Sequence, residues 1–299
     1  MKKYDAKALI GSMRVPFLVL PPVSILVGFA VAQTSLTQTA IWDLLLIIIC
    51  ALSAHISVNL FNEYHDYQTG LDAKTVRTPF SGGSGALIQT PSALGVVRYA
   101  AVITFFITTL IGLYFVYCLG GVVLPLGALG LVIILTYTQW LNRHPFLCLI
   151  APGLAFGPLM VMGTDLVLTG SYSATALFVS LVPFFLVNNL LLLNQYPDID
   201  ADKSIGRYHF PIAYGVKKST MLYGLFVVVT ALVIVIGVLF GILPVLSVLT
   251  LLPLAGGLVV LFGAVKYAQS ITRLVPYMGL NVVTTLLTPV VLSLTILYG

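Results

Sequence analysis

The residues best suited to chemistry lie in two short polar rows, each at the end of a long apolar run. Their members carry amide or carboxylate side chains and are Asn59, Asn62, Asp66 and Asp72 in the first row and Asn194, Asp198 and Asp202 in the second. Where a helix continues through a row, residues four positions apart share one face. Like charges at that spacing repel each other, so each face needs a cation. In the second row, Pro197 predicts a kink because it removes an amide donor.

Carboxylate and amide oxygens, without thiols, are the ligands that a hard cation such as Mg²⁺ prefers. Mg²⁺ typically takes one or two protein carboxylates and fills its other positions with water and phosphate oxygens. Two rows that face each other would hold such ions against a diphosphate, whose charge must be neutralised before its C–O bond breaks. Four cations lie within a few residues of a row, where they balance the remaining charge: Lys74, Arg77, Lys203 and Arg207.

Composition places these rows at the edge of a membrane. Of the 299 residues, 59% are hydrophobic and only 8% are charged, whereas soluble domains carry about a quarter charged residues. A chain of this composition is predicted to cross a membrane several times. The first apolar run follows a basic start without a small-residue cleavage site, which indicates a retained span. Three cysteines lie scattered in apolar surroundings and predict neither a metal site nor a disulfide framework: Cys50, Cys118 and Cys148.

Nine apolar segments of about 20 residues are long enough to cross a membrane. They are residues 14–32, 41–61, 95–117, 121–139, 146–164, 174–194, 219–240, 243–264 and 276–298. With nine spans, all 14 Lys and Arg fall on the same side, which the positive-inside rule makes cytoplasmic. The N-terminus is then inside and the C-terminus outside. The net charge of +5 is therefore a signal of topology and gives no reason to expect a nucleic-acid partner.

Only two loops are long, 62–94 and 195–218, and both carry a polar row on the cytoplasmic side. Long loops in compact proteins are usually functional. Without a repeat or domain boundary, residues 1–299 are predicted to form a single all-helical membrane domain. The apolar wall behind the rows suits a lipid tail. These features predict an enzyme that acts on a lipid diphosphate at the cytoplasmic face of the cell (inner) membrane.

The sequence also resembles a known family. FNEYHDYQTGLD at 61–72 and NQYPDIDADKSIGR at 194–207 resemble the two aspartate-rich motifs of the UbiA superfamily of intramembrane prenyltransferases. MRVPFLVLPPVSILVG at 13–28 resembles the opening helix of that family, and RTPFSGGSGAL at 77–87 resembles its loop after the first motif. FGPLMVMGT at 156–164 is similar to the corresponding stretch in the branch of the family that prenylates 1,4-dihydroxy-2-naphthoate on the way to menaquinone. The resemblance implies nine transmembrane helices around a central cavity that cytoplasmic loops cap.

Matching the motifs residue by residue implies the metal ligands. Mg²⁺, and through it the diphosphate, would be bound by Asn62, Asp66, Asp198 and Asp202, of which the three aspartates are the predicted catalytic residues. Two further predicted ligands are Glu63, which stands where aspartate is usual, and Asp72, which matches the last aspartate of the naphthoate-type first motif.

The predicted diphosphate-binding residues surround this set. The family places a tyrosine and a cation at the cytoplasmic end of the fourth span, where this chain has Tyr137 and Arg143. The predicted diphosphate-binding set also includes Asn59 and Asn194, which are the first residues of the two rows, and four cations: Lys74, Arg77, Lys203 and Arg207.

Other polar residues receive structural interpretations. His55 lies in mid-span and is expected to hydrogen-bond a neighbouring helix. His65 is expected to be a loop histidine, and His144 and His209 are expected to lie in cytoplasmic loops, exposed to solvent. Asp200 is expected to face away from Asp198. The glycines between 82 and 85 match no phosphate-binding fingerprint and predict a flexible loop that caps the site.

One stretch departs from the family pattern, and it leaves the acceptor open. NRHPFLCLIAPGLA at 142–155 lacks the acidic residue and much of the arginine and glycine pattern of quinone-pathway members. We predict Mg²⁺-dependent transfer of a polyprenyl group from its diphosphate to an aromatic, dihydroxynaphthoate-like acceptor, within a lipid bilayer. The alternatives are another acceptor in the same superfamily, a member with changed or lost activity, and a cation-coupled transporter. A CDP-alcohol phosphotransferase is disfavoured because the chain lacks the Ala-Arg pair of that signature.

Overall fold

The computed structural model describes residues 3–36, 38 and 40–299, and the regular structure among them is entirely helical. The longer helices are α2 (Leu20–Gln33), α3 (Ile41–Gln68), α5 (Leu94–Leu119), α6 (Leu124–Thr136), α9 (Ala174–Asn194), α11 (Phe210–Leu239), α13 (Gly256–Tyr267) and α14 (Ile271–Tyr298). Three helical segments between α6 and α9 follow one another without a break: α7 (Pro145–Leu154), a π-helical segment (Ala155–Met162) and α8 (Gly163–Thr169). The shorter helices are α1 (Lys3–Ser12), α4 (Ala86–Gln89), α10 (Ile199–Ser204) and α12 (Leu251–Leu254).

Within the described part of the chain, eight helical segments are long and apolar enough to cross a membrane. These segments are Val15–Gln33, Ile41–Gln68, Pro91–Leu119, Pro145–Thr169, Ala174–Asn194, Phe210–Leu239, Val245–Tyr267 and Ile271–Tyr298. The predicted count of nine is not confirmed, because the fourth expected span, 121–139, contains a shorter apolar helix, Gly121–Thr136. The chain is nonetheless a multi-pass, all-helical membrane protein.

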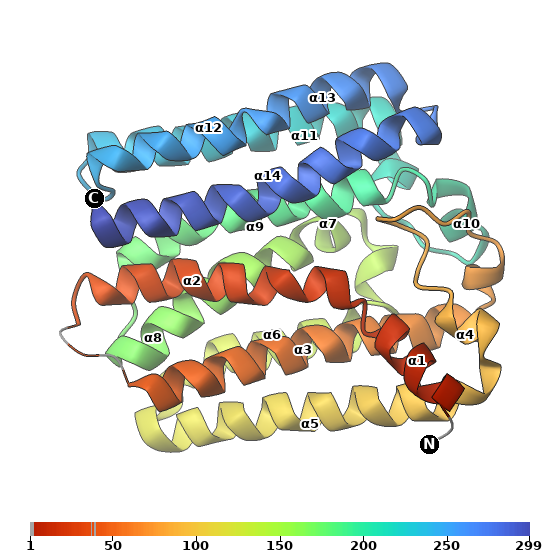
Figure 1. Ribbon diagram of the computed structural model, residues 1–299, viewed down its shortest axis with the longest axis horizontal. Coiled ribbons are helices and arrows are strands. Elements are labelled where there is room, and N and C mark those ends of the chain that lie inside the picture. Colours follow the sequence, from red (N-terminus) through yellow and green to blue (C-terminus); the bar gives the residue numbers. More distant parts are fainter. Residues whose placement is uncertain (1–2, 37, 39) are drawn as a thin grey trace.

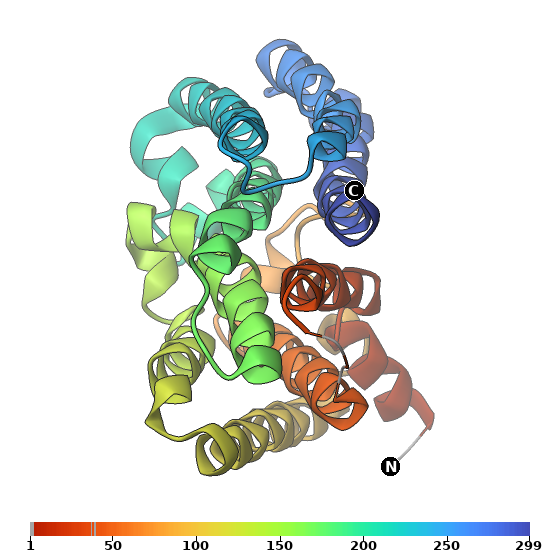
Figure 2. The ribbon, with the colours of Figure 1, turned by 90° about the vertical axis from the view of Figure 1, so that its left-hand side faces the viewer.

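The long helices run side by side, with the N- and C-terminal ends of the chain at opposite ends of the bundle (Figure 1). Helix α9 is the central element, and 67% of its apolar window is buried. It packs against α2, α7, α11 and α14, which surround it in the end-on view (Figure 2). Helix α3 packs along α5 on one flank, and α13 packs along α14 on the other. This arrangement brings the C-terminal ends of α3 and α9, where the polar rows begin, to the same end of the bundle.

Glycines allow the helices around α9 to approach closely. A Cβ on Gly157 would lie 2.6 Å from the Ser180 carbonyl oxygen of α9, and a Cβ on Gly28 of α2 would lie 2.8 Å from Thr164 Cβ. Small residues at such crossings are the usual way for membrane helices to pack backbone against backbone. The π-helical segment is therefore held tightly between α2 and α9.

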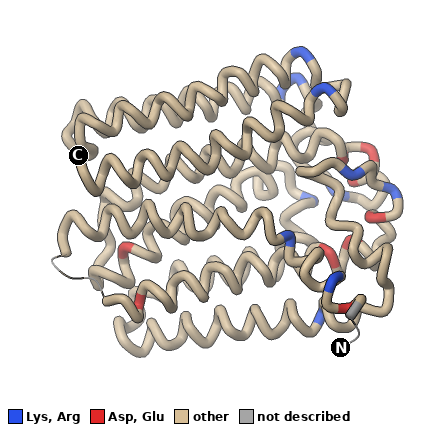
Figure 3. The backbone as a smooth tube through the Cα atoms, in the orientation of Figure 1, with Lys and Arg blue, Asp and Glu red and all other residues tan. Residues whose placement is uncertain are grey.

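Charged residues gather at one end of the bundle (Figure 3). Lys and Arg lie at that end together with most of the Asp and Glu, whereas Asp43, in the first turn of α3, and Asp165, in α8, lie toward the other end. The one-sided distribution that the sequence predicts therefore holds for the described residues, while Lys2 lies outside them. The assignment of the charged end to the cytoplasm stays a prediction.

The two polar rows differ in backbone structure. Helix α3 runs past the predicted span 41–61 into the predicted loop 62–94 and ends at Gln68, so it carries Asn59, Asn62 and Asp66 but not Asp72. Helix α9 ends at Asn194, as in the predicted span 174–194, so the helix does not continue through the second row, and a turn precedes α10. A proline disfavours helix at the residue before it, and here the turn 195–198, which contains Pro197, separates α9 from α10 instead of a kink. Asp198 is the residue that precedes α10, and Asp202 lies within that short helix.

Candidate active site

A cavity of about 210 Å³ lies at the charged end of the bundle. All seven residues of the two polar rows line it: Asn59, Asn62, Asp66, Asp72, Asn194, Asp198 and Asp202. The first four come from α3 and the turn that follows it, and the last three come from the end of α9, the next turn and α10. Although the helix breaks within the second row, the turn and α10 still present Asp198 and Asp202 to the side from which α3 presents Asp66.

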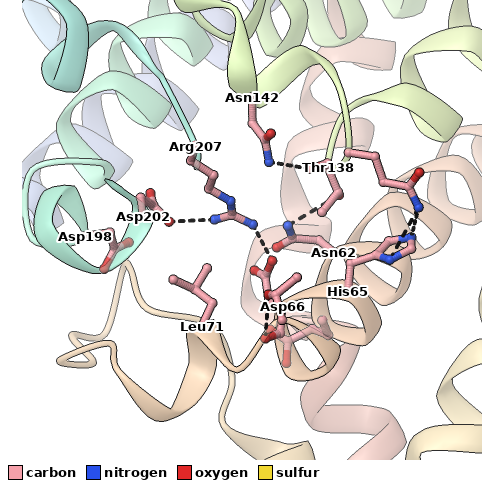
Figure 4. A network of polar contacts seen from close by, with 12 residues as sticks. Asn62, His65, Asp66, Leu71, Thr138, Asn142, Asp198, Asp202 and Arg207 are labelled. Atoms are coloured by element: carbon pink, nitrogen blue, oxygen red, sulfur yellow. Dashed lines mark hydrogen bonds and ion pairs between the residues drawn. The ribbon is translucent and has the colours of Figure 1, made fainter. Parts of the chain in front are cut away.

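Arg207 joins the two rows (Figure 4). Its Nη1 lies 2.9 Å from Asp202 Oδ1, and its Nη2 forms an ion pair with Asp66 Oδ1. His209 Nε2 is hydrogen-bonded to the other Asp202 oxygen at 3.0 Å. Burial acts to lower the pKa of Arg207, but the charges of Asp66 and Asp202 raise that pKa above its usual range. Burial likewise acts to raise the pKa of Asp202, but the hydrogen bond from His209 and the charge of Arg207 hold it below its usual range.

Asp198 and Asp72 are paired less completely. Burial, together with the charge of Asp202, raises the pKa of Asp198 to about 7. Burial and the charge of Glu63 raise the pKa of Asp72 to about 6. These two carboxyl groups therefore hold a proton more tightly than exposed aspartates do, because burial disfavours the charged form and the nearby arginines only partly offset this rise in pKa.

The glycine-rich loop closes over both rows. The backbone N–H of Gly82 donates to Asp198 Oδ2 at 3.2 Å, and a Cβ on Gly83 would lie 2.7 Å from Asp72 Oδ1. Gly82, Gly83 and Gly85 all have positive φ angles, a conformation that residues with a side chain rarely adopt. The loop thus has the capping position expected of it.

Buried oxygen atoms around the cavity lack hydrogen-bond partners. Within the described residues these atoms are Oδ2 of Asp72, Oδ1 of Asp198, and the side-chain carbonyl oxygens of Asn194 and Asn142. Buried polar atoms are usually paired, and oxygens of this kind are the donors that a hard cation prefers. The described His, Cys, Asp and Glu residues form no group of three that could hold a metal ion alone. The donor set therefore fits a cation that a bound phosphate helps to coordinate.

Glu63, a predicted metal ligand, lies outside the cavity. Its side chain is 0% exposed, and its Oε1 accepts hydrogen bonds from Arg14 Nε at 2.9 Å and from the Ser84 backbone N–H at 2.8 Å. Its Oε2 accepts from the Ser84 hydroxyl at 2.5 Å. Both oxygens are thus occupied, so Glu63 anchors Arg14 and the glycine-rich loop instead of presenting an oxygen to the cavity.

Arg14 is a site residue that the sequence analysis missed. It lines the cavity, and its Nη2 donates to Asn62 Oδ1 at 3.2 Å. Arg14 is the only described residue other than glycine with a positive φ, 53°. Such a conformation is unfavourable for a residue with a side chain and is found where surrounding contacts enforce it, often at functional sites. In the sequence, its position at the start of the first predicted span, 14–32, indicates only topology.

The predicted diphosphate-binding residues fall into two groups. Tyr137, Asn59, Asn194 and Arg207 line the cavity, whereas four cations lie outside it: Lys74, Arg77, Arg143 and Lys203. Lys74 Nζ lies 3.3 Å from the Ser204 hydroxyl, and Arg77 Nη2 donates to the Asp72 carbonyl at 3.1 Å. Arg143 lines a neighbouring polar pocket of about 330 Å³ that shares Asp66 and Arg207 with the cavity.

The histidines are placed differently from what the sequence predicts. His209, expected in solvent, is 2% exposed and lines the cavity beside Asp202, so that prediction is wrong. His65 belongs to α3 and pairs with Gln139 at 2.8 Å, so it is not a loop residue. His55 lines the inner wall of the cavity, where its ring meets that of Phe156 edge to face at 5.0 Å. Asp200 is exposed and lies away from the cavity, as expected.

Comparisons with known proteins show what the chain is similar to. Residues 22–283 match the model of the UbiA prenyltransferase family. The chain is 28% identical over 187 residues to the 1,4-dihydroxy-2-naphthoate octaprenyltransferase of Bacillus subtilis (strain 168), a match that spans 60% of this chain and 58% of that protein.

Solved structures share the fold. A UbiA homologue from Archaeoglobus fulgidus bound to DMAPP and Mg²⁺ superposes with a TM-score of 0.66 at 15% identity, covering 95% of this chain and 99% of that one. An apo UbiA homologue from Aeropyrum pernix K1 gives a TM-score of 0.65 at 17% identity, covering 94% and 97%. The family match over most of the chain, the two acidic motifs at one cavity and the shared fold lead to one conclusion: this chain belongs to the UbiA prenyltransferase family.

Proposed function

We propose that the protein transfers a polyprenyl group from a polyprenyl diphosphate to an aromatic acceptor in an Mg²⁺-dependent reaction. The observation that carries this proposal is the convergence of both acidic rows on one cavity, where Arg207 spans Asp66 and Asp202. Charges within a membrane span are unfavourable and are seldom kept without a use. The A. fulgidus homologue, which binds DMAPP and Mg²⁺, supports the same class of substrate and metal.

The metal would be held by Asp66, Asp198 and Asp202, with Asn62 and Asp72 beside them. Asp198 and Asp72 present free oxygens, whereas Asp66 and Asp202 are paired with Arg207. Arg207 thus occupies a position between two carboxylates that suits a cation. When bound, Mg²⁺ neutralises the diphosphate and makes it a better leaving group.

The chain's own residues have distinct tasks in this reaction. Arg14 and Arg207 line the cavity and would hold diphosphate oxygens by charge-assisted hydrogen bonds. The glycine-rich loop covers the site and would keep out water, which destroys an allylic cation. Aromatic side chains in the lining, Phe17, Phe80 and Phe156, offer π faces that stabilise a cation. The C–O bond of the donor breaks, the diphosphate leaves with the electron pair, and an allylic cation remains. The acceptor carbon then forms its bond to the prenyl group and loses a proton to a carboxylate or to the released diphosphate.

The B. subtilis relative supports a dihydroxynaphthoate-like acceptor. The stretch 142–155, which departs from the family pattern, supplies Asn142, Cys148 and Pro152 to the cavity lining and would therefore contact this acceptor. We also propose that residues 1–299 act as one domain in the cell (inner) membrane, with the charged end in the cytoplasm. The charges at one end of the bundle fit this orientation and do not favour a transport path through its middle (Figure 3).

The test is an assay of the purified protein with geranylgeranyl diphosphate, with and without Mg²⁺, and with a panel of acceptors. The panel contains 1,4-dihydroxy-2-naphthoate, 4-hydroxybenzoate, homogentisate and glycerol-phosphate lipids. We expect an Mg²⁺-dependent prenylated dihydroxynaphthoate. Another prenylated product would keep the reaction and change the acceptor, whereas folded protein that releases no diphosphate with any donor would contradict the proposal.

Matched variants make the assay specific to the site. Asp66→Asn and Asp198→Asn should each lower turnover by roughly a hundredfold or more, because a group that stabilises developing charge is lost. Asp200→Asn makes the same substitution at an exposed position outside the cavity and should leave turnover unchanged. Equal effects of all three substitutions would show that the loss does not come from the site.

A further inference from the structure

A second polar pocket, with a volume of about 330 Å³, lies beside the polar cavity. Asp66, Asn142 and Arg207 line both spaces and therefore form the partition between them (Figure 4). The other walls come from the end of α3, from the segment 138–143 after α6 and from Ile205 after α10. We call this space the side pocket.

The side pocket leads from the buried Asp66–Arg207 ion pair to the surface. Asp66 and Asn142 are only 4% and 6% exposed, whereas Thr69, Gln139 and Arg143, which also line the pocket, are exposed. Residues of the glycine-rich loop line the polar cavity but not the side pocket. The side pocket is therefore a route from the ion pair to water that bypasses the loop.

The lining of the side pocket suits an anion. Its described residues carry two guanidinium groups, Arg143 and Arg207, and one carboxylate, Asp66, which is already paired with Arg207. Thr138 and Gln139 add a hydroxyl and an amide that can donate hydrogen bonds. Guanidinium groups bind phosphate oxygens through parallel N–H donors, and a cleft with an excess of one charge attracts the opposite charge. The side pocket thus fits a small phosphate-type anion.

Hydrogen bonds join the walls of the side pocket to one another. The Tyr208 backbone N–H donates to the Asn142 carbonyl at 2.9 Å, which ties the segment after α10 to the segment after α6. Gln139 Nε2 lies 2.8 Å from His65 Nε2, which ties the segment after α6 to α3. Three segments from distant parts of the chain are thus held in place around the pocket.

Inorganic diphosphate is the reaction component whose chemistry matches this route. The prenyl donor and the aromatic acceptor each have an apolar part, whereas the released diphosphate has none and must leave for water. Arg207 lines both the polar cavity and the side pocket, and the exposed Arg143 lines only the side pocket. The two side chains therefore offer successive guanidinium groups along the way from the cavity to water.

We propose that the side pocket is the release site for inorganic diphosphate, in which the anion passes from Arg207 to Arg143. The inference rests on the proposed function and adds the path by which this product leaves. It also gives Arg143 a task, since this cation lies outside the polar cavity. No covalent bond forms or breaks in this step, because the anion exchanges one guanidinium partner for another.

The test fills the polar cavity with a non-reactive donor analogue and then probes the side pocket. The protein is saturated with Mg²⁺ and geranylgeranyl thiolodiphosphate, and inorganic diphosphate is added in a calorimetric titration. We expect the wild type to bind one further equivalent. Arg143→Gln should weaken this binding by at least about tenfold, because a charge-assisted hydrogen bond is lost. Arg143→Lys keeps the charge and should weaken it less.

Arg273→Gln is the matched control for the titration. Arg273 is an exposed arginine of α14 that lines neither the polar cavity nor the side pocket. Its substitution removes the same charge from the same end of the bundle, so the further equivalent should bind as in the wild type.

Inhibition by the product gives a second readout, measured at a constant concentration of free Mg²⁺. If diphosphate occupies the side pocket while the donor occupies the polar cavity, an excess of donor does not fully relieve the inhibition. In Arg143→Gln the inhibition should become purely competitive with the donor, whereas Arg273→Gln should keep the wild-type pattern. A loss of folding alone would not change this pattern.

Three results would overturn the inference. The first is a saturated wild type that binds no further diphosphate, and the second is equal binding by Arg143→Gln and Arg273→Gln. The third is displacement of the further diphosphate by 1,4-dihydroxy-2-naphthoate, which would assign the side pocket to the acceptor. Failure of the wild type to bind the thiolodiphosphate would instead contradict the proposed function. Titration of the free protein with inorganic diphosphate, comparing Arg143→Gln with Arg273→Gln, would then test the side pocket by itself.

Discussion

Arg207 and Asp66, which lie 141 residues apart in the chain, form an ion pair beside the polar cavity. The same guanidinium binds Asp202 of the second motif at 2.9 Å. One cation thus neutralises a carboxylate from each motif, although the two belong to different helices. Buried carboxylates without such a partner are strongly unfavourable, so this arrangement explains how both motifs fold against each other before any ligand binds.

The Arg207 bridge predicts a loss of stability in Arg207→Gln. Removing one partner of a buried ion pair destabilises a protein by about 3–5 kcal/mol, because the remaining charges stay buried without compensation. We expect a lower temperature of thermal unfolding for the purified protein in Mg²⁺-free buffer. Arg207→Lys keeps the charge but loses the planar fork, and should unfold at an intermediate temperature. Wild-type unfolding temperatures in both variants would contradict the role of the bridge.

Glu63 is predicted to act on structure and not on the metal. Glu63→Gln removes the charge that holds Arg14 and weakens the contacts to Ser84. The unfolding temperature should therefore fall, and the KM for the diphosphate donor should rise. The Mg²⁺ concentration for half-maximal activity should stay close to that of the wild type, whereas Asp198→Asn should raise it. A large rise in Glu63→Gln would return Glu63 to the set of metal ligands.

The unpaired oxygens around the cavity predict that Mg²⁺ and diphosphate bind together. Because the described acidic residues form no metal cage by themselves, neither Mg²⁺ nor inorganic diphosphate alone should raise the unfolding temperature much. Together, at a hundredfold excess over their apparent Kd, they should stabilise the folded protein by about 2.7 kcal/mol. The measurement is a thermal shift, which needs no turnover, and Asp198→Asn is the variant in which the shift should disappear. An equal shift with Mg²⁺ alone would indicate a site already complete without phosphate.

The glycine at the crossing of the π-helical segment and α9 predicts an overpacking effect. In Gly157→Ala the new Cβ would lie 2.6 Å from the Ser180 carbonyl oxygen, and extra atoms in a packed core destabilise by about 1–3 kcal/mol. Gly95→Ala adds the same atom to α5 in open space. This substitution should be neutral or stabilising, because alanine has a higher helix propensity than glycine. Thermal unfolding of the two variants side by side checks the prediction. A result of the same sign and size in both would contradict it.

The amino-acid sequence by itself determined the class of fold and the residues of the two rows. Long apolar runs identify membrane helices because each helix must satisfy its backbone hydrogen bonds internally, which is a local property. Asp66 and Asp202 could be singled out because charges are scarce in this chain and their spacing to neighbouring polar residues is helical. The apolar run also marks the end of α9 at Asn194, because polar residues and Pro197 follow it. It does not mark the end of α3, which continues to Gln68 through polar residues whose burial depends on other helices.

Tertiary structure decided which polar groups meet, because these contacts join residues that lie far apart in the chain or whose contact no local sequence pattern predicts. The pairing of Glu63 with Arg14 connects positions 49 residues apart and removes Glu63 from the cavity. The burial of His209 depends on where α10 places Asp202, which periodicity does not reveal. The sequence does not reveal the packing role of a glycine either, since Gly157 and Gly112 both lie in apolar runs. Only packing shows that the first closes a helix contact and the second borders empty space, because the neighbours of each come from other helices.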